Sequence, residues 1–134
     1  MKNNLEFFIF IVFLNLCMVE NLKANEPFIF DVTEIEILEN GNQVNGYKGG
    51  KVVSEDGSKI IAENFYYNKL TNILEAEGNV RYIDDTNNTT ITTDKAIYLK
   101  NEEKIFTKGN SKAENENNTI TSLNLEYDKI QNIY

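Results

Sequence analysis

The chain has 134 residues and a formal charge of −8; 41% of its residues are hydrophobic and 25% are charged, values ordinary for a folded domain. It contains no His and a single Cys, Cys17, which excludes Ser-His-Asp or Cys-His catalysis and zinc sites built on these residues. Its sole Arg is Arg81 and its lysines are scattered, so the chain lacks the clustered cations that nucleic-acid binding requires.

The first 24 residues have the architecture of a signal peptide. A short polar start with Lys2 precedes an apolar run from Phe7 to Val19, and a polar stretch ends at Ala24. The apolar run is too short for a comfortable transmembrane helix of about 20 residues. We therefore expect a helical signal segment over residues 1–24 and export of the rest to a bacterial periplasm. An uncleaved N-terminal anchor and lipidation at Cys17 are the alternatives.

From residue 28 onward the sequence predicts an all-β protein. Short alternating runs rich in Ile, Val, Tyr, Phe and Thr are separated by clusters of Asn, Gly, Asp and Lys, and no segment sustains a helical apolar period. Tight turns are expected where Asn, Asp and Gly gather, because these residues tolerate positive φ. The predicted turns are Asn40–Asn42, Asn68–Asn72, Lys100–Lys104 and Asp128–Asn132, and longer loops are predicted at Asp84–Asn88 and Glu114–Asn118.

The runs also repeat with a period of about 30 residues. Lys59–Asn88 aligns with Thr90–Asn118 and again with Thr119–Tyr134, and a weaker copy covers Phe30–Val53. The repeat places Tyr67, Tyr98 and Tyr127 at equivalent positions, and Ile35 and Ile37 where Phe65 and Tyr67 stand. Each unit predicts strand, tight turn, strand and polar loop. Four such pairs give roughly eight antiparallel strands, enough for a partial sandwich or jelly roll.

Two units carry a Gly-Asn pair in the middle of a strand, at Gly78-Asn79 and Gly109-Asn110. Period-two alternation places one apolar set on the inner face, namely Leu74, Ala76, Gly78, Val80 and Tyr82. Both glycines are therefore predicted to face inward, where they either bend the sheet or leave a slot for an apolar ligand. Asn79 is predicted to point outward and to contribute little.

The motif I-x-A-x-x-F-x-Y-N at residues 60–68, followed by L-x-A-x-G-N-V at residues 74–80, resembles the OstA-like repeat of lipopolysaccharide-transport proteins. A degraded second form covers residues 93–113, and the resemblance extends over residues 30–134. It implies an antiparallel β-jelly roll over residues 28–134, open along one edge. Its groove would carry the acyl chains of lipopolysaccharide, and its terminal strands would pair with the same fold in other transport proteins.

The resemblance leaves the family member open. The last unit stops at Tyr134, inside a repeat, so we expect a domain that is incomplete at its C-terminus. An N-terminal part of the outer-membrane assembly protein would end in this way. A soluble periplasmic bridge protein that exposes its last strand for pairing is the alternative.

The expected function is a non-enzymatic periplasmic module that shields lipopolysaccharide acyl chains, with or without association with the outer membrane. We expect no catalytic residue, metal, cofactor or nucleic-acid partner. The alternative is a β-repeat structural or adhesin-like surface protein without a lipid groove. The resemblance assigns the groove to Phe65, Tyr67, Leu74, Ala76, Gly78, Val80, Tyr82, Tyr98, Ile105, Gly109, Leu125 and Tyr127.

Overall fold

The computed structural model describes residues 26–134, and the predicted signal segment lies outside them. Ten antiparallel strands form one sheet, which confirms the all-β prediction. Within residues 26–134 the only helical element is a 3-10 turn, η1 (Glu39–Gly41), and no helix there is long and apolar enough to cross a membrane. The strands are β1 (Phe28–Leu38), β2 (Gln43–Ser54), β3 (Lys59–Ala62), β4 (Asn64–Asn68), β5 (Ile73–Asp84), β6 (Thr89–Leu99), β7 (Lys104–Lys108), β8 (Ser111–Glu114), β9 (Thr119–Ser122) and β10 (Glu126–Asp128).

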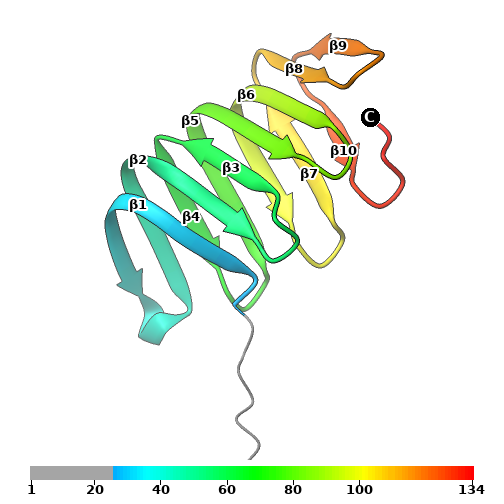
Figure 1. Ribbon diagram of the computed structural model, residues 1–134. Coiled ribbons are helices and arrows are strands. Elements are labelled where there is room, and N and C mark those ends of the chain that lie inside the picture. Colours follow the sequence, from blue (N-terminus) through cyan, green and yellow to red (C-terminus); the bar gives the residue numbers. More distant parts are fainter. Residues whose placement is uncertain (1–25) are drawn as a thin grey trace, which may run out of the picture.

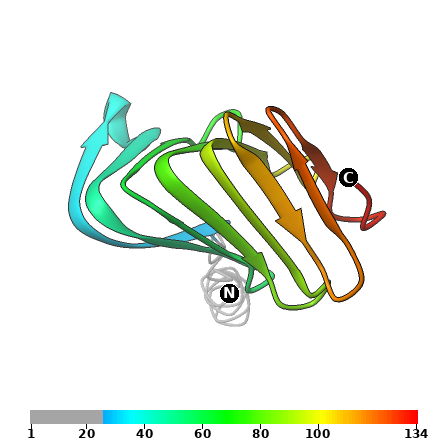
Figure 2. The same cartoon turned by 90° about the horizontal axis from the view of Figure 1, so that it is seen from above.

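The sheet is folded over on itself. The first half of β5 pairs with β4 and its second half with β3; β6 pairs with β7 and β8 in the same divided way. The long strands curve over at the top of Figure 1, so each contributes to two layers. We call the layer with β3, β8 and β9 the front layer and the layer with β4, β7 and β10 the rear layer (Figures 1 and 2).

The predicted turns and loops all fall at strand ends, as Asn, Asp and Gly there favour, but the turn between β2 and β3 at residues 55–58 is not among those predicted. All strand pairs in the sheet are antiparallel, so the repeats do not wind into a solenoid. The strand count differs from the expected eight. Three predicted strands are each split at the bend, giving the pairs β3 and β4, β7 and β8, and β9 and β10, and the last of the eight is reduced to an isolated bridge between Asp128 and Ile133.

The two Gly-Asn pairs make the bend. The register of β5 with β6 shifts between Glu77 and Val80, and Gly78 (φ 83°) and Asn79 (φ 49°) both take positive φ in that bulge. Gly109 and Asn110 repeat this with φ of 78° and 41°. Two residues with positive φ reverse the pleat locally, which turns the strand from one layer into the other. The prediction that the glycines bend the sheet is confirmed.

The prediction that these glycines face inward is wrong. A Cβ placed on Gly78 would lie 2.5 Å from the Oε2 atom of the exposed Glu63, and one on Gly109 would meet the carboxylate of the exposed Asp94. The bulge breaks the period-two alternation on which the inward assignment rested. Asn79 also contributes more than expected, since its amide donates a 2.7 Å hydrogen bond to Glu63 Oε1.

The core lies between the two layers and is rich in rings. Phe28 and Phe30 of the front layer pack edge-on against Tyr67 and Phe65 of the rear layer, with ring centroids 5.0 and 6.3 Å apart. Such contacts add to the hydrophobic effect, which contributes about 25 cal/mol for each Å² of apolar surface removed from water. The folded sheet is stable because the apolar faces of the two layers pack against each other and are thereby shielded from water.

Candidate functional site

The candidate site is the inner surface of the folded sheet, which three of the four repeat units line with an equivalent tyrosine. Each tyrosine hydroxyl donates to the side chain five residues later, in the following turn. The pairs are Tyr67 with Asn72 (2.9 Å), Tyr98 with Glu103, and Tyr127 with Asn132 (3.2 Å). All three acceptor residues have positive φ, between 50° and 54°. The repeat thus couples an inward ring to a tight turn.

The middle of the inner surface is filled by its own side chains. Nine of the residues predicted to line a groove are no more than 2% exposed. These are Phe65, Tyr67, Leu74, Ala76, Val80, Tyr82, Tyr98, Ile105 and Tyr127. Leu125 is half-buried against the same cluster, while Gly78 and Gly109 lie at the bend, apart from it. The structure brings ten of the twelve residues together as a core, and their contact with lipid stays a prediction.

Apolar side chains remain uncovered on the inner face at the β1 end. Ile35 and Ile37 pair in register with Gly46 and Val44, so they lie on the inner side of the rear layer. They are nevertheless 52% and 63% exposed, because the β1 end has no strand above them. Sequence reasoning left both residues out of the site. The repeat itself held the signal, since it aligns them with Phe65 and Tyr67.

The opposite end is closed by polar contacts between the loops. Asp84, only 2% exposed, accepts hydrogen bonds from the backbone N–H groups of Thr86 (3.1 Å) and Asn87 (3.2 Å) and from the Asn87 amide (3.0 Å). The Asn87 amide also reaches the Tyr127 hydroxyl at 3.1 Å and the Lys129 carbonyl at 3.2 Å. These bonds join the β5–β6 loop of the front layer to β10 of the rear layer.

Lys129 makes a second connection between the layers. Its ammonium pairs with Asp56, in the loop between β2 and β3, and lies 3.7 Å from Glu103 Oε2 in the rear layer. Burial lowers the pKa of Lys129 to about 8, which still lies above neutral pH. Lys129 is therefore charged at neutral pH and ties the two layers together.

Burial also governs the inner tyrosines. It raises the pKa values of Tyr67, Tyr82 and Tyr98, and raises that of Tyr127 to about 12. Nearby carboxylates reinforce the shift, Asp84 for Tyr82 and Tyr127, and Glu103 for Tyr98. All four hydroxyls stay protonated at neutral pH and act as hydrogen-bond groups. The arrangement suits the burial of apolar groups beside neutral hydroxyls rather than acid–base chemistry.

A family model described as OstA-like protein matches residues 29–134. The chain belongs to this OstA-like family. The match spans all ten strands but for one residue of β1, so the family assignment rests on the whole folded sheet. It confirms the resemblance that the repeat motifs indicated.

A similar solved structure is that of LptH from Pseudomonas aeruginosa, described as the LptA homologous periplasmic component of the conserved lipopolysaccharide transport device. The TM-score is 0.67 at 16% sequence identity, and the match covers 81% of this chain and 80% of that one. At this identity the likeness shows the fold, which confirms the β-jelly roll. A search of curated proteins finds no match.

At both ends of the OstA-like sheet, the terminal strands have an edge that is not paired with another strand. β1 pairs only with β2 and β9 only with β8; β10 pairs with β7 and, at Asp128 alone, with Ile133. Ile120 on β9 is exposed, whereas Tyr127 on β10 is covered by Tyr134, whose ring stacks on it at 5.1 Å. Both ends present free backbone groups to which another strand can hydrogen-bond.

Proposed function

We propose that this OstA-like chain is a non-enzymatic periplasmic module of lipopolysaccharide transport, which shields acyl chains between its two layers. The observation that carries the proposal is the uncovered apolar surface at Ile35 and Ile37, which continues into the inner core. Acyl chains that enter beside Ile35 and Ile37 would remove apolar surface of both the lipid and the protein from water, which favours binding. The net charge of −8 is compatible with this, because the acyl chains supply the binding free energy.

Other observations support the same function. LptH, which shares the fold, is a periplasmic component of a lipopolysaccharide transport device. The free edges at β1 and at β9 and β10 suit pairing with strands of similarly folded transport proteins. The proposal covers both a bridge protein and an N-terminal part of the outer-membrane assembly protein, in the periplasm alone or associated with the outer membrane.

The test is photocrosslinking in the cell from two positions on the same strand. Ile37 and Ile29 are both isoleucines of β1 with nearly equal exposure, 63% and 65%. Ile37 lies on the inner face, whereas Ile29 pairs with the outward Val53 and lies on the outer face. A photoreactive residue at position 37 should crosslink to lipopolysaccharide, and one at position 29 should not.

Equal crosslinking from the two positions would contradict the proposal. It would mean that lipopolysaccharide contacts any exposed apolar residue nonspecifically, whichever face of the sheet that residue lies on. The absence of lipid crosslinks from position 37 and also from Leu74, deeper on the inner face, would reject it as well.

A further inference from the structure

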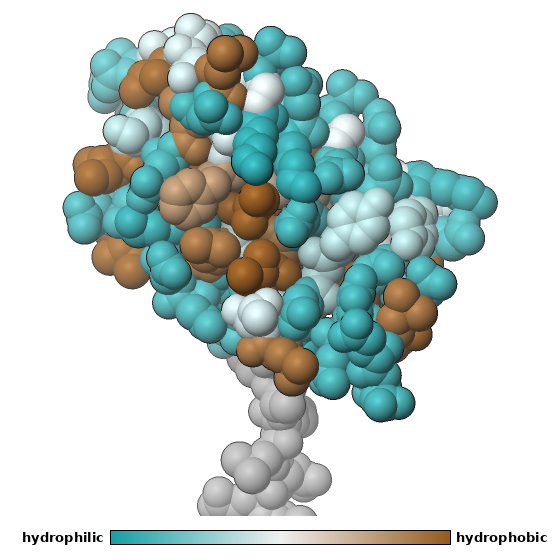
Figure 3. All heavy atoms as spheres, turned by 180° about the vertical axis from the view of Figure 1, so that it is seen from behind, coloured by the Kyte–Doolittle hydropathy of each residue, from teal (hydrophilic) through white to brown (hydrophobic). Residues whose placement is uncertain are grey.

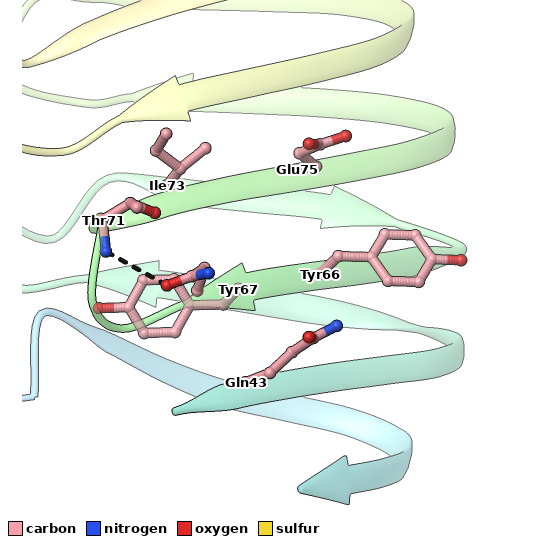
Figure 4. A pocket seen from close by; sticks show the side chains of 7 residues that line it. Gln43, Tyr66, Tyr67, Thr71, Ile73 and Glu75 are labelled. Carbon is pink, nitrogen blue, oxygen red and sulfur yellow. Dashed lines mark hydrogen bonds between the residues drawn. The ribbon is translucent and has the colours of Figure 1, made fainter. Parts of the chain in front are cut away.

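A hollow of about 240 Å³ lies on the outer face of the rear layer, beside the turn between β4 and β5 (Figure 4). Gln43, Tyr66 and Glu75 project toward the same side from β2, β4 and β5. Tyr67, Asn68, Thr71 and Ile73 complete the wall at the turn. Its volume is below that of pockets for drug-sized ligands, which begin at roughly 300 Å³, so a single ring is the group that fits.

The side chains of the hollow are held in place by their neighbours. The Tyr66 ring packs edge-on against Tyr47, with centroids 6.1 Å apart. The Gln43 amide donates to Asn45 Oδ1 at 3.1 Å, and the Asn45 amide, 4% exposed, donates to the Tyr47 hydroxyl at 3.1 Å. These bonds fix the aromatic ring and the amide before any ligand arrives, which lowers the entropy lost on binding.

The turn side of the hollow is fixed in the same manner. Asn68 Oδ1 accepts the backbone N–H groups of Leu70 (2.9 Å) and Thr71 (3.2 Å), the second of which is drawn in Figure 4. Glu75 is held by Lys95, whose ammonium lies 2.6 Å from its Oε2 atom. The Tyr66 hydroxyl has no hydrogen-bond partner among residues 26–134, so it is free to bond a ligand.

This set of groups selects one class of ligand. Glu75 is the only charged lining group, so it repels a phosphate or another anion. An acyl chain would offer no hydrogen bond to the free Tyr66 hydroxyl, and it would displace water from the partly exposed Gln43 amide and Glu75 carboxylate without replacing its hydrogen bonds. A sugar ring has an apolar C–H face for the Tyr66 ring and hydroxyls that both donate to Glu75 and accept from Gln43.

We propose that this hollow binds one pyranose ring of a neutral saccharide. The site borders the inner surface, since Tyr67, next to Tyr66 on β4, points inward and bonds Asn72 in the same turn. A sugar headgroup of a lipid held between the layers can therefore reach over this turn. That source of the sugar rests on the proposed function, whereas the site itself does not.

The test is an NMR titration of residues 26–134 with glucose, galactose and N-acetylglucosamine. One of these sugars should shift the amides of Gln43, Tyr66 and Glu75, with a Kd of about 1 mM, as expected for a shallow single-ring site. Tyr66→Ala should weaken binding at least tenfold, and Tyr66→Phe less, because it keeps the ring and loses only the hydroxyl.

Phe106→Ala is the matched control. Phe106 is a half-buried ring on the same outer face, in register with Ile97, and lies outside the hollow. Apolar side chains gather on this face, so a nonspecific apolar contact would involve it (Figure 3). Sugar binding should be unchanged in this variant.

The proposal is overturned if none of the sugars shifts these amides, if Phe106→Ala weakens binding as much as Tyr66→Ala does, or if inorganic phosphate or laurate produces the same shifts. Laurate titrated alone separates the two functions, since its expected shifts lie at Ile35 and Ile37. Laurate binding without sugar binding rejects the hollow and leaves the lipid function standing; sugar binding without laurate binding does the reverse.

Discussion

The two ends of the folded sheet hold their layers together by different means. At the β1 end the contacts across the core are between rings, such as Phe28 with Tyr67 and Phe30 with Phe65, and the ion pair that crosses there, Lys69 with Glu26, is more exposed to water than Lys129. At the β10 end, hydrogen bonds and an ion pair cross between the layers as well. They run from Asn87 to Tyr127, between Thr89 and Tyr134, and from Lys129 to Asp56.

This difference indicates which end opens more easily. Packed rings can slide or separate without leaving a polar atom unpaired, and Ile35 and Ile37 are already uncovered at the β1 end. Separation at the β10 end breaks directional bonds of buried groups, including those that the Asn87 amide donates to the Tyr127 hydroxyl and the Lys129 carbonyl. We therefore expect the layers to part first at β1, the same end at which the proposed function admits acyl chains.

Alkaline pH should have the largest effect, because it acts on the tyrosines that both ends share. The folded pKa values of Tyr67, Tyr82, Tyr98 and Tyr127 are raised, that of Tyr127 to about 12. A raised folded pKa means that the stabilisation is complete below the unfolded value of about 10 and is lost as pH rises above it. We expect cooperative unfolding between pH about 10 and about 12, with tyrosinate absorbance rising as the β-sheet circular dichroism signal falls. Tyrosinate formed at any of these four tyrosines, followed by NMR of their rings, while the sheet signal persists would contradict this.

The bend that links both ends offers the next largest effect. Gly78→Ala should lower the free energy of unfolding by roughly 1–3 kcal/mol, because φ is 83° and the new Cβ would meet Glu63. Gly57→Ala is the matched control, with φ of 89° and no atom within 4 Å of the Cβ. Denaturant unfolding should show a smaller loss for Gly57→Ala. Equal losses would mean that backbone strain alone accounts for the effect and that the close approach of Glu63 adds nothing.

The smallest effect on stability should come from removing the ion pair of Lys129, which connects the two layers at the β10 end. Lys129→Met should destabilise the protein by roughly 1–2 kcal/mol and raise amide hydrogen exchange at the β10 end, with no change at β1. Lys104→Met removes a more exposed pair with Glu126 on the outer face and should change stability by about 0.5 kcal/mol or less. If Lys129→Met instead increased exchange at β1 as much as at β10, the two ends would not be held independently.

Much of the fold follows from local sequence rules. Asn and Gly clusters predict the turns, since positive φ is accessible to these residues, and alternation correctly places Leu74, Ala76, Val80 and Tyr82 inward. The error at Gly78 arises where alternation fails, because a bulge with two positive-φ residues shifts the pattern that period-two reasoning assumes to continue. The side-chain pairing of Asn79 with Glu63 joins β5 to the bend between β3 and β4, 16 residues away, and has no local signature.

The candidate site was less predictable than the fold. The repeat identifies which tyrosines face inward, but exposure depends on what covers each residue. Ile37 and Tyr67 occupy equivalent repeat positions, yet one is open and the other buried, because β1 is the terminal strand. The hollow at Tyr66 likewise depends on how three neighbouring strands line up in register.

By itself the sequence determined the strands, the turns, the repeat and the family, because these depend on residue preferences within a few positions of the chain. Only the tertiary structure decided that each long strand serves two layers, that the middle of the inner surface is filled, and that one end is closed by Lys129 and Asp84. Those features depend on contacts between residues far apart in the chain, such as the 73 positions that separate Lys129 from Asp56. Such contacts exist only once the sheet has folded over.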